Sequence, residues 1–293
     1  MDVGISTLIQ VLIWGLYAGC IYILLAIGLN LIFGVMKIVN FAHGELLMIS
    51  AYVTFFFFTI SGFNPYVLLL ASMPMMVVLG VMIERLCFRP ILGTGKLNEI
   101  FVSMGLIYFL QNMVALIWTD EWRVIHSPFE AITISVGSFD LPLDYFIIIL
   151  LTVIILIGLY AFLRRTTLGR AIRATSQNRK GAKLMGINVE QMDMLAFGIG
   201  SGLAAAAGTL WAVSGQVFNP YMGSIPAIKA FAIIILGGLG SIPGAIVGGL
   251  LYGIAENVTA FTIGGAWKDA ISFILLITVL IIRPTGLFGE KGE

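Results

Sequence analysis

Residues 3–36 read VGISTLIQVLIWGLYAGCIYILLAIGLNLIFGVM, and no charged side chain interrupts this stretch. A helix needs about 20 apolar residues to cross the hydrocarbon core of a bilayer, so the stretch predicts one membrane span with residues to spare. No Lys or Arg precedes it, whereas a cleaved signal peptide begins with a positively charged region. We therefore expect a permanent transmembrane helix at the start of the chain.

The rest of the sequence has the same apolar character. Of its 293 residues, 59% are hydrophobic and 11% are charged, and the mean hydropathy is +1.04. Soluble domains carry roughly 25% charged residues, so a soluble enzyme is excluded. The formal net charge is +1, which leaves no basic face for nucleic acid. We expect an integral protein surrounded by membrane lipid, with no nucleic-acid partner.

Further uncharged runs indicate further spans. The run 46–83 is too long for one helix, and Pro65 disfavours helical geometry at Asn64, so two helices and a tight turn are expected there. The other expected spans are Ile100–Thr119, Tyr145–Leu163, two helices from Met194 onward separated near Asn219–Tyr221, one after the Gly-rich stretch 237–241, and Ile271–Ile282. The prediction is one all-α polytopic transmembrane domain over residues 1–293 with about nine spans, in a range of eight to ten. Because the apolar runs are continuous and not alternating, a β-barrel is excluded.

Lys and Arg residues indicate the orientation, because cytoplasmic loops carry an excess of them. If the spans alternate, Lys37, Arg85, the basic loop 164–183 and Arg283 all fall on one side. The segment 119–144 on the opposite side is acidic, and Arg123 is its only Lys or Arg. We expect an N-out, C-in topology in the cell inner (plasma) membrane.

The loop 164–193 between the fifth and sixth spans is too long for a simple turn. Its middle, Leu168–Met185, is rich in residues that favour helix, and Gly186 is placed to end that helix in a left-handed cap. A short cytoplasmic helix is a suitable docking element for a soluble partner. A solvated loop that only orients the protein explains the composition as well.

A polar cluster of Asn40, His43 and Glu45 lies between the first two apolar runs. Ionisable groups at membrane depth are costly and usually face a cavity or one another, so the cluster is a candidate for a permeation path. A helix that starts here could also present free backbone N–H groups to an aqueous vestibule. The alternative is an interfacial loop whose polar residues are simply wet.

Residues 235–253, ILGGLGSIPGAIVGGLLYG, combine small residues with helix breakers. Gly237, Gly238, Gly240 and Pro243 break the helix, and lipid tolerates such a break only where the backbone is buried or lines a cavity. The stretch therefore indicates either a broken helix near the path or a compact, tightly packed hairpin. A similar break precedes the second apolar run, which suggests an internal repeat.

Isolated polar residues within the apolar runs also allow two interpretations. Lys229 and Glu256 either pair with each other or extend to opposite interfaces. Asn30, Gln111 and Asn112 are expected to link helices by hydrogen bonds more often than they contact a solute.

Motifs for catalysis and metal binding are missing from the sequence. The stretch GTGKL at 93–97 departs from a nucleotide-binding P-loop at both ends, and no HExxH motif occurs. We expect no catalytic residue, no metal site and no cofactor, so energy for pumping would have to come from a separate subunit.

Three stretches together resemble a known family: GLNLIFGVMKIVNFAHGELLMISAY at 28–52, TTLGRAIRATSQNRKGAKLMGINV at 166–189 and ILGGLGSIPGAIVGG at 235–249. In this order they resemble the permease subunits of branched-chain amino-acid ABC importers. The resemblance implies a second permease subunit as a heterodimeric partner, two ABC ATPase subunits and an extracytoplasmic amino-acid-binding protein. It also implies translocation by alternating access, without ATP hydrolysis by this chain.

The resemblance gives the loop 164–193 a role, because a cytoplasmic loop of this family docks into a cleft on the ATPase. The family's Glu-Ala-Ala motif falls on Lys180, Gly181 and Ala182, with Gly186 at the expected spacing, although Lys180 and Gly181 depart from the pattern. The residues expected to couple to the ATPase are Arg170, Arg173, Arg179, Lys180, Gly181, Ala182, Lys183, Leu184 and Gly186. Charge reversal at Arg179 or Lys183 is predicted to reduce uptake and ATPase stimulation while membrane insertion stays intact.

The residues expected along the translocation path are Asn40, His43, Glu45, Gly237, Gly238, Gly240 and Ser241. Two other functions remain compatible with the sequence. A permease of the same superfamily could carry urea, short amides or other amino acids, and a channel or carrier could work without ATP. Co-purification of ATPase subunits would distinguish an ABC permease from a channel.

Overall fold

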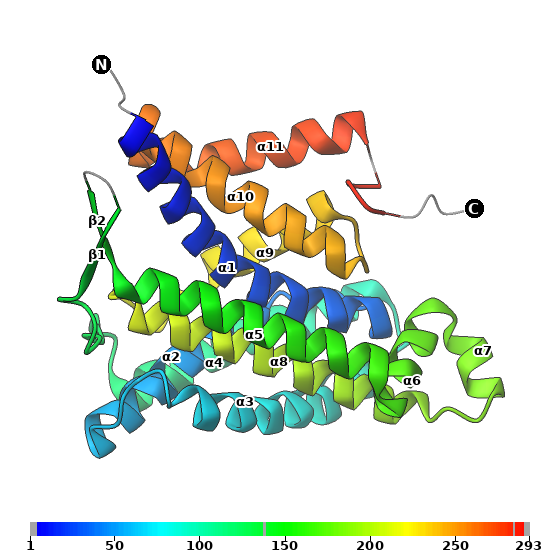
Figure 1. The fold of residues 1–293 in the computed structure, drawn as a ribbon. Helices are drawn as coiled ribbons and strands as arrows, with labels where there is room; N and C mark the ends of the chain where they lie inside the picture. Colours follow the sequence, from blue (N-terminus) through cyan, green and yellow to red (C-terminus); the bar gives the residue numbers. More distant parts are fainter. Residues whose placement is uncertain (1–4, 137–138, 284, 290–293) are drawn as a thin grey trace.

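Helix α1 (Ile5–Met36) forms the centre of the molecule, which a computed structural model describes for residues 5–136, 139–283 and 285–289. The helix is apolar on every face, and a helix of that kind is stable only when it is surrounded. Its middle is fully enclosed, because Leu24, Leu25, Ala26 and Ile27 are all 0% exposed. The other helices are arranged around it (Figure 1).

The elements follow one another along the chain as predicted, apart from the details given below. The remaining long helices are α2 (His43–Ser61), α3 (Leu69–Ile83), α4 (Lys96–Trp118), α5 (Leu143–Arg165), α8 (Val189–Val213), α9 (Ser224–Gly237), α10 (Ile242–Thr262) and α11 (Lys268–Ile282). Within the described residues, eight helices are long and apolar enough to cross a membrane, and α9 is apolar but shorter. This all-α polytopic architecture agrees with the predicted range of spans.

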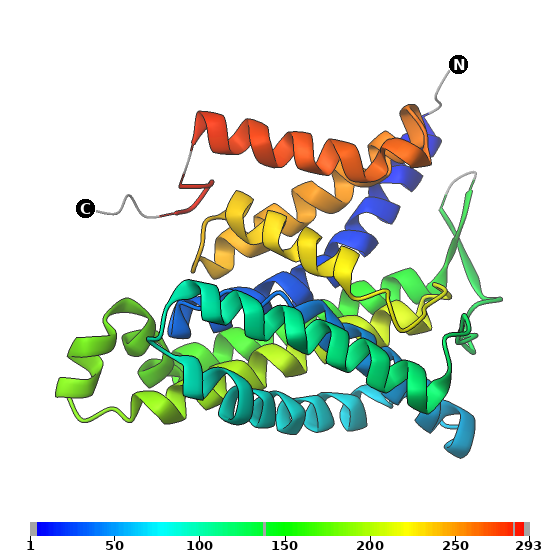
Figure 2. The ribbon, with the colours of Figure 1, turned by 180° about the vertical axis from the view of Figure 1, so that it is seen from behind.

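The packing of the helices places two groups on either side of α1. Helix α1 packs most extensively against α10 and α8, and α8 packs in turn against α2 and α3. Helices α9 and α10 form a hairpin on the opposite side of α1, with α11 packed against both of them. Seen from behind, α4 crosses the front of the α2–α3 side and α9 lies beside it, toward α10 (Figure 2).

The two ends of the bundle agree with the predicted topology. One end carries the short helices α6 (Thr167–Gln177) and α7 (Arg179–Leu184), the α9–α10 turn and the end of α11 (Figure 1). The other end carries the start of α1, the turn between α2 and α3 and a small β-hairpin. The loops rich in Lys and Arg therefore share one end of the bundle, which is the cytoplasmic end by the positive-inside rule.

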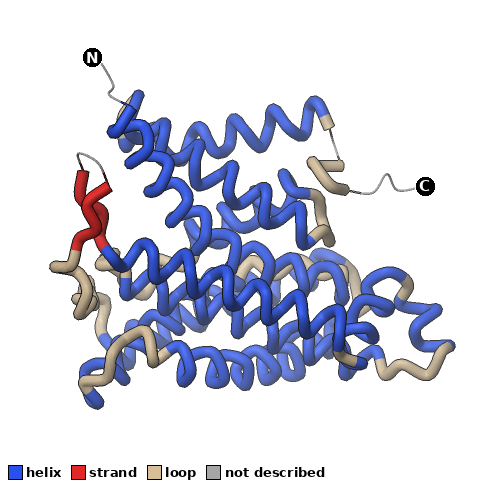
Figure 3. Tube along the Cα trace, in the orientation of Figure 1, coloured by secondary structure: helices blue, strands red, loops and turns tan. Residues whose placement is uncertain are grey.

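The β-hairpin at the outer end is an element that the sequence analysis did not predict. Strands β1 (Thr133–Val136) and β2 (Phe139–Pro142) pair antiparallel and are the only strands in the described residues (Figure 3). The same segment is joined to the loop after α8, because the backbones of Arg123 and Phe218 exchange two hydrogen bonds of 2.9 Å.

Two predicted helix boundaries are wrong. The single helix expected over 168–185 is divided into α6 and α7 at Asn178, which adopts an extended conformation and caps α7 by accepting a hydrogen bond from the Gly181 N–H at 2.8 Å. Asn competes with helical hydrogen bonding in this way and therefore favours caps over helix interiors. The third span also continues past Ile83, through a π-helical turn, η1 (Glu84–Phe88), and a short 3-10 turn, η2 (Arg89–Ile91).

Candidate functional site

Helix α2 begins inside the bundle and not at its cytoplasmic end. Its first residue, His43, lies against Gly28 of α1 and close to Gly200 of α8. Gly28 precedes Met36, the last residue of α1, by eight residues, which corresponds to a rise of about 12 Å. The segment 37–42 therefore turns back from the end of α1 toward the interior before α2 starts. Lys37 makes this reversal with a left-handed backbone conformation (φ 59°).

The three polar residues predicted for the path are buried at this position. Asn40, His43 and Glu45 are 1%, 0% and 1% exposed, which excludes the interpretation of a wet interfacial loop. The Asn40 side chain accepts a hydrogen bond from the Ala42 N–H at 3.0 Å, and this turn starts the helix. Both ring nitrogens of His43 are buried and have no hydrogen-bond partner among the described residues.

Glu45 joins three helices. Its Oε1 accepts a hydrogen bond from Gln111 of α4 at 2.9 Å and a longer one from Ser224 of α9 at 3.4 Å. Gln111 Nε2 also donates to Ser224 at 3.2 Å, so the amide links helices as predicted. The other carboxylate oxygen, Oε2, is buried and has no hydrogen-bond partner among the described residues.

The start of α9 meets the start of α2 at this carboxylate. The backbones of Gly44 and Gly223 are in direct contact, so close that neither position has room for a side chain. Helix α9 has 14 residues, about 21 Å, and is too short to cross the hydrocarbon core of about 30 Å. Two helix N-termini therefore converge within the bundle, and the positive ends of both helix dipoles favour a negative charge between them.

The predicted glycine turn lies elsewhere, at the cytoplasmic end of the α9–α10 hairpin. The backbones of Gly237 and Gly244 touch, and Ser241 caps α10 by accepting a hydrogen bond from the Gly244 N–H at 3.1 Å. The Gly240 N–H donates to the Asn30 side chain of α1 at 2.7 Å, which confirms the predicted linking role of that amide. The stretch thus forms the compact hairpin, and its place along a path stays a prediction.

Asn112 differs from the other two amides. It is exposed, and its side chain donates to the Tyr108 carbonyl of its own helix at 2.7 Å. This hydrogen bond joins no second helix, so the linking role expected for Asn112 is not seen within this chain.

Lys229 and Glu256 form a buried ion pair, which decides between the two interpretations of the sequence. Lys229 Nζ lies 2.5 Å from Glu256 Oε1 and 2.8 Å from Asp269 Oδ1, and the Lys229 and Glu256 side chains are 8% and 0% exposed. Lys268 approaches the same Glu256 oxygen at 3.2 Å. Tyr22 of α1 accepts a hydrogen bond from Lys229 at 3.3 Å. The network joins α1, α9, α10 and α11 and balances two positive against two negative charges.

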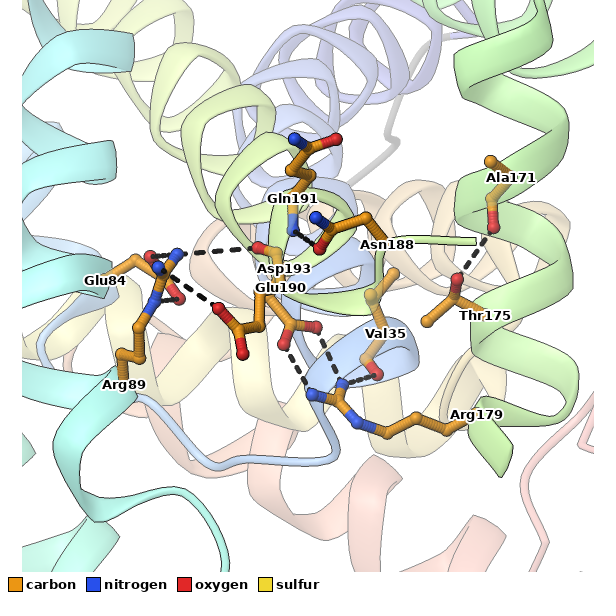
Figure 4. Close-up of polar contacts among 10 residues, drawn as sticks. All are labelled: Val35, Glu84, Arg89, Ala171, Thr175, Arg179, Asn188, Glu190, Gln191 and Asp193. Atoms are coloured by element: carbon orange, nitrogen blue, oxygen red, sulfur yellow. Dashed lines mark hydrogen bonds and ion pairs between the residues drawn. The ribbon is translucent and has the colours of Figure 1, made fainter. Parts of the chain in front are cut away.

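In the basic loop, Arg179 is the residue that fixes the position of α7. Its guanidinium makes a two-point contact with Asp193 of α8, with N···O distances of 2.7 and 2.5 Å, and donates to the Val35 carbonyl at the end of α1 at 3.2 Å (Figure 4). Asp193 is completely buried, and a fork-to-fork contact of this kind holds both partners in one geometry. Arg179 thus anchors the loop to the bundle.

A second ion pair lies on the neighbouring α3 extension. Arg89 makes a two-point contact with the buried Glu84, at 3.2 and 2.9 Å, and reaches the exposed Glu190 at the start of α8 at 3.7 Å (Figure 4). Neither Asp193 nor Glu84 was predicted as part of a site. The available signal was their position, because each is an acidic residue at the border of a long apolar run.

The predicted cap at Gly186 is confirmed. Gly186 has a φ of 81°, its N–H donates to the Lys183 carbonyl at 3.1 Å, and the Ile187 N–H donates to the Ala182 carbonyl at 3.0 Å. This pair of hydrogen bonds is the Schellman motif, which glycine adopts without strain. The cap ends α7 directly after Leu184 and Met185, which are 88% and 83% exposed. The loop therefore presents an apolar tip to the solvent.

The other predicted coupling residues differ in exposure and in position on the loop. Lys180 and Lys183 are exposed, Gly181 is half-buried, and Ala182 is buried at 5% exposure. Arg170 and Arg173 lie on α6, where Arg173 Nε donates to the Leu163 carbonyl at the end of α5 at 3.1 Å. The loop residues and the path residues thus form separate regions: the loop extends beyond the cytoplasmic end, and the Glu45 cluster lies within the bundle.

Comparison with known proteins agrees with this architecture. A family model described as branched-chain amino acid transport system / permease component matches residues 11–280. The chain is 37% identical to the high-affinity branched-chain amino acid transport system permease protein BraD of Pseudomonas aeruginosa, over 96% of both chains. It is 36% identical to the corresponding permease protein LivH of Escherichia coli K12, over 94% of both chains.

A more distant relative has a different printed role. The autoinducer 2 import system permease protein LsrC of Yersinia pestis is 27% identical over 66% of this chain and 56% of LsrC. No solved structure matches the chain. The family model matches most of the chain, and eight helices among the described residues are long and apolar enough to cross a membrane. The chain is therefore a multi-pass membrane protein that belongs to the family described as branched-chain amino acid transport system / permease component.

Proposed function

We propose that the chain is the transmembrane permease subunit of an ABC importer for branched-chain amino acids in the inner membrane. The observation that carries this proposal is the apolar tip of α7, formed by Leu184 and Met185. It extends from the cytoplasmic end of a chain whose curated relatives BraD and LivH are permease proteins of such transport systems. An exposed apolar pair on a rigid loop is typical of a surface that another protein covers.

The loop has the construction that force transmission requires. Its tip is fixed by the Schellman cap at Gly186, and its root is fixed by the pairing of Arg179 with Asp193 and by the Val35 carbonyl. A displacement of the tip by a docked ATPase therefore acts directly on the end of α1 and the start of α8. Both helices belong to the buried centre of the bundle, so the displacement reaches the helices that surround the path.

The Glu45 cluster is the proposed membrane-embedded section of the path. The short helix α9 and the inward-starting helix α2 give this section irregular backbone, which lipid tolerates only beside a cavity or within protein. The boundary between α2, α4 and α9 then separates and closes as the two permease subunits alternate between inward and outward states. The glycine turn 237–241 lies on the cytoplasmic side of this section.

The residues of this chain indicate which tasks other subunits of the importer carry out. The sequence has no nucleotide-binding P-loop, so ATP hydrolysis is assigned to two separate ATPase subunits. A second permease subunit provides the other half of the path, and an extracytoplasmic binding protein delivers the amino acid. A cargo with an apolar side chain suits helices of this composition.

Autoinducer 2 is a second candidate cargo class, because the relative LsrC is a permease protein of an autoinducer 2 import system. It is less similar to this chain than BraD and LivH are, and it matches over a smaller part of it. We therefore assign branched-chain amino acids as the cargo. Competition by unlabelled valine, isoleucine and autoinducer 2 against leucine uptake distinguishes the two cargo classes, and urea and acetamide test the amide class.

The test is transport by the importer reconstituted in proteoliposomes, with Leu184 and Met185 both replaced by serine. Burial of each side chain stabilises docking by about 1.5–3 kcal/mol, so leucine uptake and ATPase stimulation should fall at least about tenfold. Leu168→Ser is the matched control, because Leu168 is also exposed on the same loop but lies on α6 away from the tip. Normal coupled transport by the double variant, or solute conduction by this chain alone, contradicts the proposal.

A further inference from the structure

A pocket of about 290 Å³ opens at the outer end of this single subunit, apart from the Glu45 cluster. It lies between the first half of α1, the start of α5, the end of α8 and the end of α10, with Lys268 at the start of α11 as a further wall. The same end carries the β-hairpin and is the extracytoplasmic end by the loop charges. Pockets for drug-sized ligands range from about 300 to 1,000 Å³, so this one suits a smaller molecule.

The deeper walls of the pocket are aromatic. Tyr17 of α1 stacks on Tyr145 of α5, with ring centroids 4.4 Å apart and an interplanar angle of 20°. Tyr22 and Trp211 contribute further ring surface. Tyr17 and Tyr22 are 8% and 3% exposed, so these rings are held in place by packing. Such walls offer an apolar side chain a large contact area at a small entropic cost.

Three of the lining residues are polar and come from different elements: Gln216 from the α8–α9 loop, Asn257 from α10 and Lys268 from α11. Gln216 and Lys268 supply N–H donors on long side chains. An ammonium with three donors can hold a carboxylate and keep its contact with Glu256, which lies 3.2 Å from Lys268 Nζ. The polar side of the pocket is therefore suited to a carboxylate.

An ion network adjoins this polar side of the pocket and shares Lys268 with it. Its members are Lys229, Glu256, Asp269 and Lys268. Tyr22 connects the two, because its ring lines the pocket and its hydroxyl accepts a hydrogen bond from Lys229. Lys229 Nζ also lies 5.3 Å from the centroid of the Tyr22 ring. The network fixes the charged end of the pocket, and its own charges are balanced before a ligand arrives.

We propose that this pocket binds one apolar α-amino acid within the single subunit, with the carboxylate toward Lys268 and Gln216 and the side chain among the tyrosine and tryptophan rings. The pocket would receive the amino acid at the outer face before the path opens. The identity of the ligand rests on the proposed function, whereas its chemical class rests on the aromatic walls and the donors.

The experiment measures binding of radiolabelled L-leucine to the importer complex in nanodiscs, without nucleotide and without the binding protein. One site per copy of this chain is expected. L-Leucinol, which lacks the carboxylate, and glycine, which lacks the side chain, should each compete at least about tenfold more weakly than unlabelled leucine, since a charged hydrogen bond and a buried side chain each contribute that much.

Two variants test the position of the site. Ala18→Leu places a larger side chain into the pocket from α1, and Tyr145→Ala removes one aromatic wall; each should weaken leucine binding at least about tenfold. Ala115→Leu and Tyr108→Ala are matched controls on α4, which does not line the pocket. Equal competition by leucinol, or unchanged binding in both pocket variants, overturns the proposal.

Uptake by the same complexes separates this inference from the proposed function. If the wild-type complex imports leucine and both pocket variants bind and import it normally, the pocket assignment fails and the proposed function stands. If the wild-type complex binds leucine at this site but imports none with ATP and the binding protein present, the proposed function fails and the pocket assignment stands.

Discussion

Replacement of Arg179 by alanine removes the contact that fixes α7 to the bundle. The Arg179 guanidinium makes two hydrogen bonds to Asp193, and a third to the Val35 carbonyl. Loss of one partner of a fully buried ion pair costs about 3–5 kcal/mol. The Arg179 side chain is 39% exposed, however, so water replaces part of the lost interaction. We expect a local destabilisation of about 2 kcal/mol.

Hydrogen exchange of the backbone amides in 179–188 measures this change directly. A loss of about 2 kcal/mol in the closed state corresponds to roughly 30-fold faster exchange of these amides in the Arg179→Ala variant. The Arg179→Lys variant should exchange these amides at a rate between those of the wild type and the Arg179→Ala variant. An ammonium keeps the positive charge but cannot make the two-point contact. Exchange in the core of α1, at residues 20–30, should stay at the wild-type rate.

Lys180→Ala is the matched control for the loop. Lys180 is the exposed neighbour of Arg179, so its removal should leave exchange of the loop unchanged even where it weakens docking to the ATPase. The reasoning is refuted if Arg179→Ala exchanges like the wild type in 179–188, or if Lys180→Ala accelerates exchange as strongly. This measurement also separates two roles for Arg179, since a residue that contacts only the ATPase would not change exchange in the isolated permease.

Two further predictions concern the bundle itself. Lys229→Met leaves the Glu256 carboxylate buried without its closest cation and should lower the free energy of unfolding by about 3–5 kcal/mol, which is measured as a lower thermal midpoint. The double variant Lys229→Met, Glu256→Gln should recover most of this loss, because no buried carboxylate is then left without its cation. A double variant no more stable than Lys229→Met contradicts the pairing. Gly208→Ala on α8 places a methyl group against the Leu47 carbonyl of α2 and should lower the thermal midpoint. Gly105→Ala on α4 should leave the midpoint unchanged or raise it, because no atom of the described residues outside the adjoining backbone of α4 lies within 4 Å of the added carbon. Equal midpoints for the two alanine variants would show that the α2–α8 contact is not tight.

The span pattern could be predicted because each bilayer crossing needs a long apolar run, and such runs are read directly from the sequence. The turn at 61–65 and the cap at Gly186 were also predictable, since both depend on local backbone preferences. Gly62 and Gly186 adopt the left-handed conformations expected at such positions, with φ values of 64° and 81°.

The division of the loop helix at Asn178 could not be predicted with the same rules. Helix propensity favours a continuous helix across 168–185. The Asn178 cap outweighs this preference only once α6 is packed against α5 and α1. The β-hairpin was missed although its sequence carried a signal. TISV at 133–136 and FDL at 139–141 alternate polar and apolar residues and are separated by Gly137-Ser138, a pattern that is typical of a hairpin.

The candidate sites show a similar limit. The sequence indicated Asn40, His43 and Glu45 as unusual, because polar residues between apolar runs are costly. It gave no means of placing Ser224 beside Glu45, since the two residues are far apart in the chain and α9 appears in the sequence as part of a longer apolar run. Likewise, Lys229 and Glu256 were recognised as isolated charges, but Asp269 and Lys268 became part of the same network only through the packing of α11.

The burial of α1 has a consequence for biogenesis. Helix α1 is synthesised before the two helices that cover most of it, α8 (Val189–Val213) and α10 (Ile242–Thr262). Until then its faces must be sheltered by acyl chains or by the insertion machinery. The bundle can therefore close around α1 only after α10 has been synthesised. A nascent chain halted before residue 189 would be inserted in the membrane without its packing partners and would be exposed to quality-control proteases.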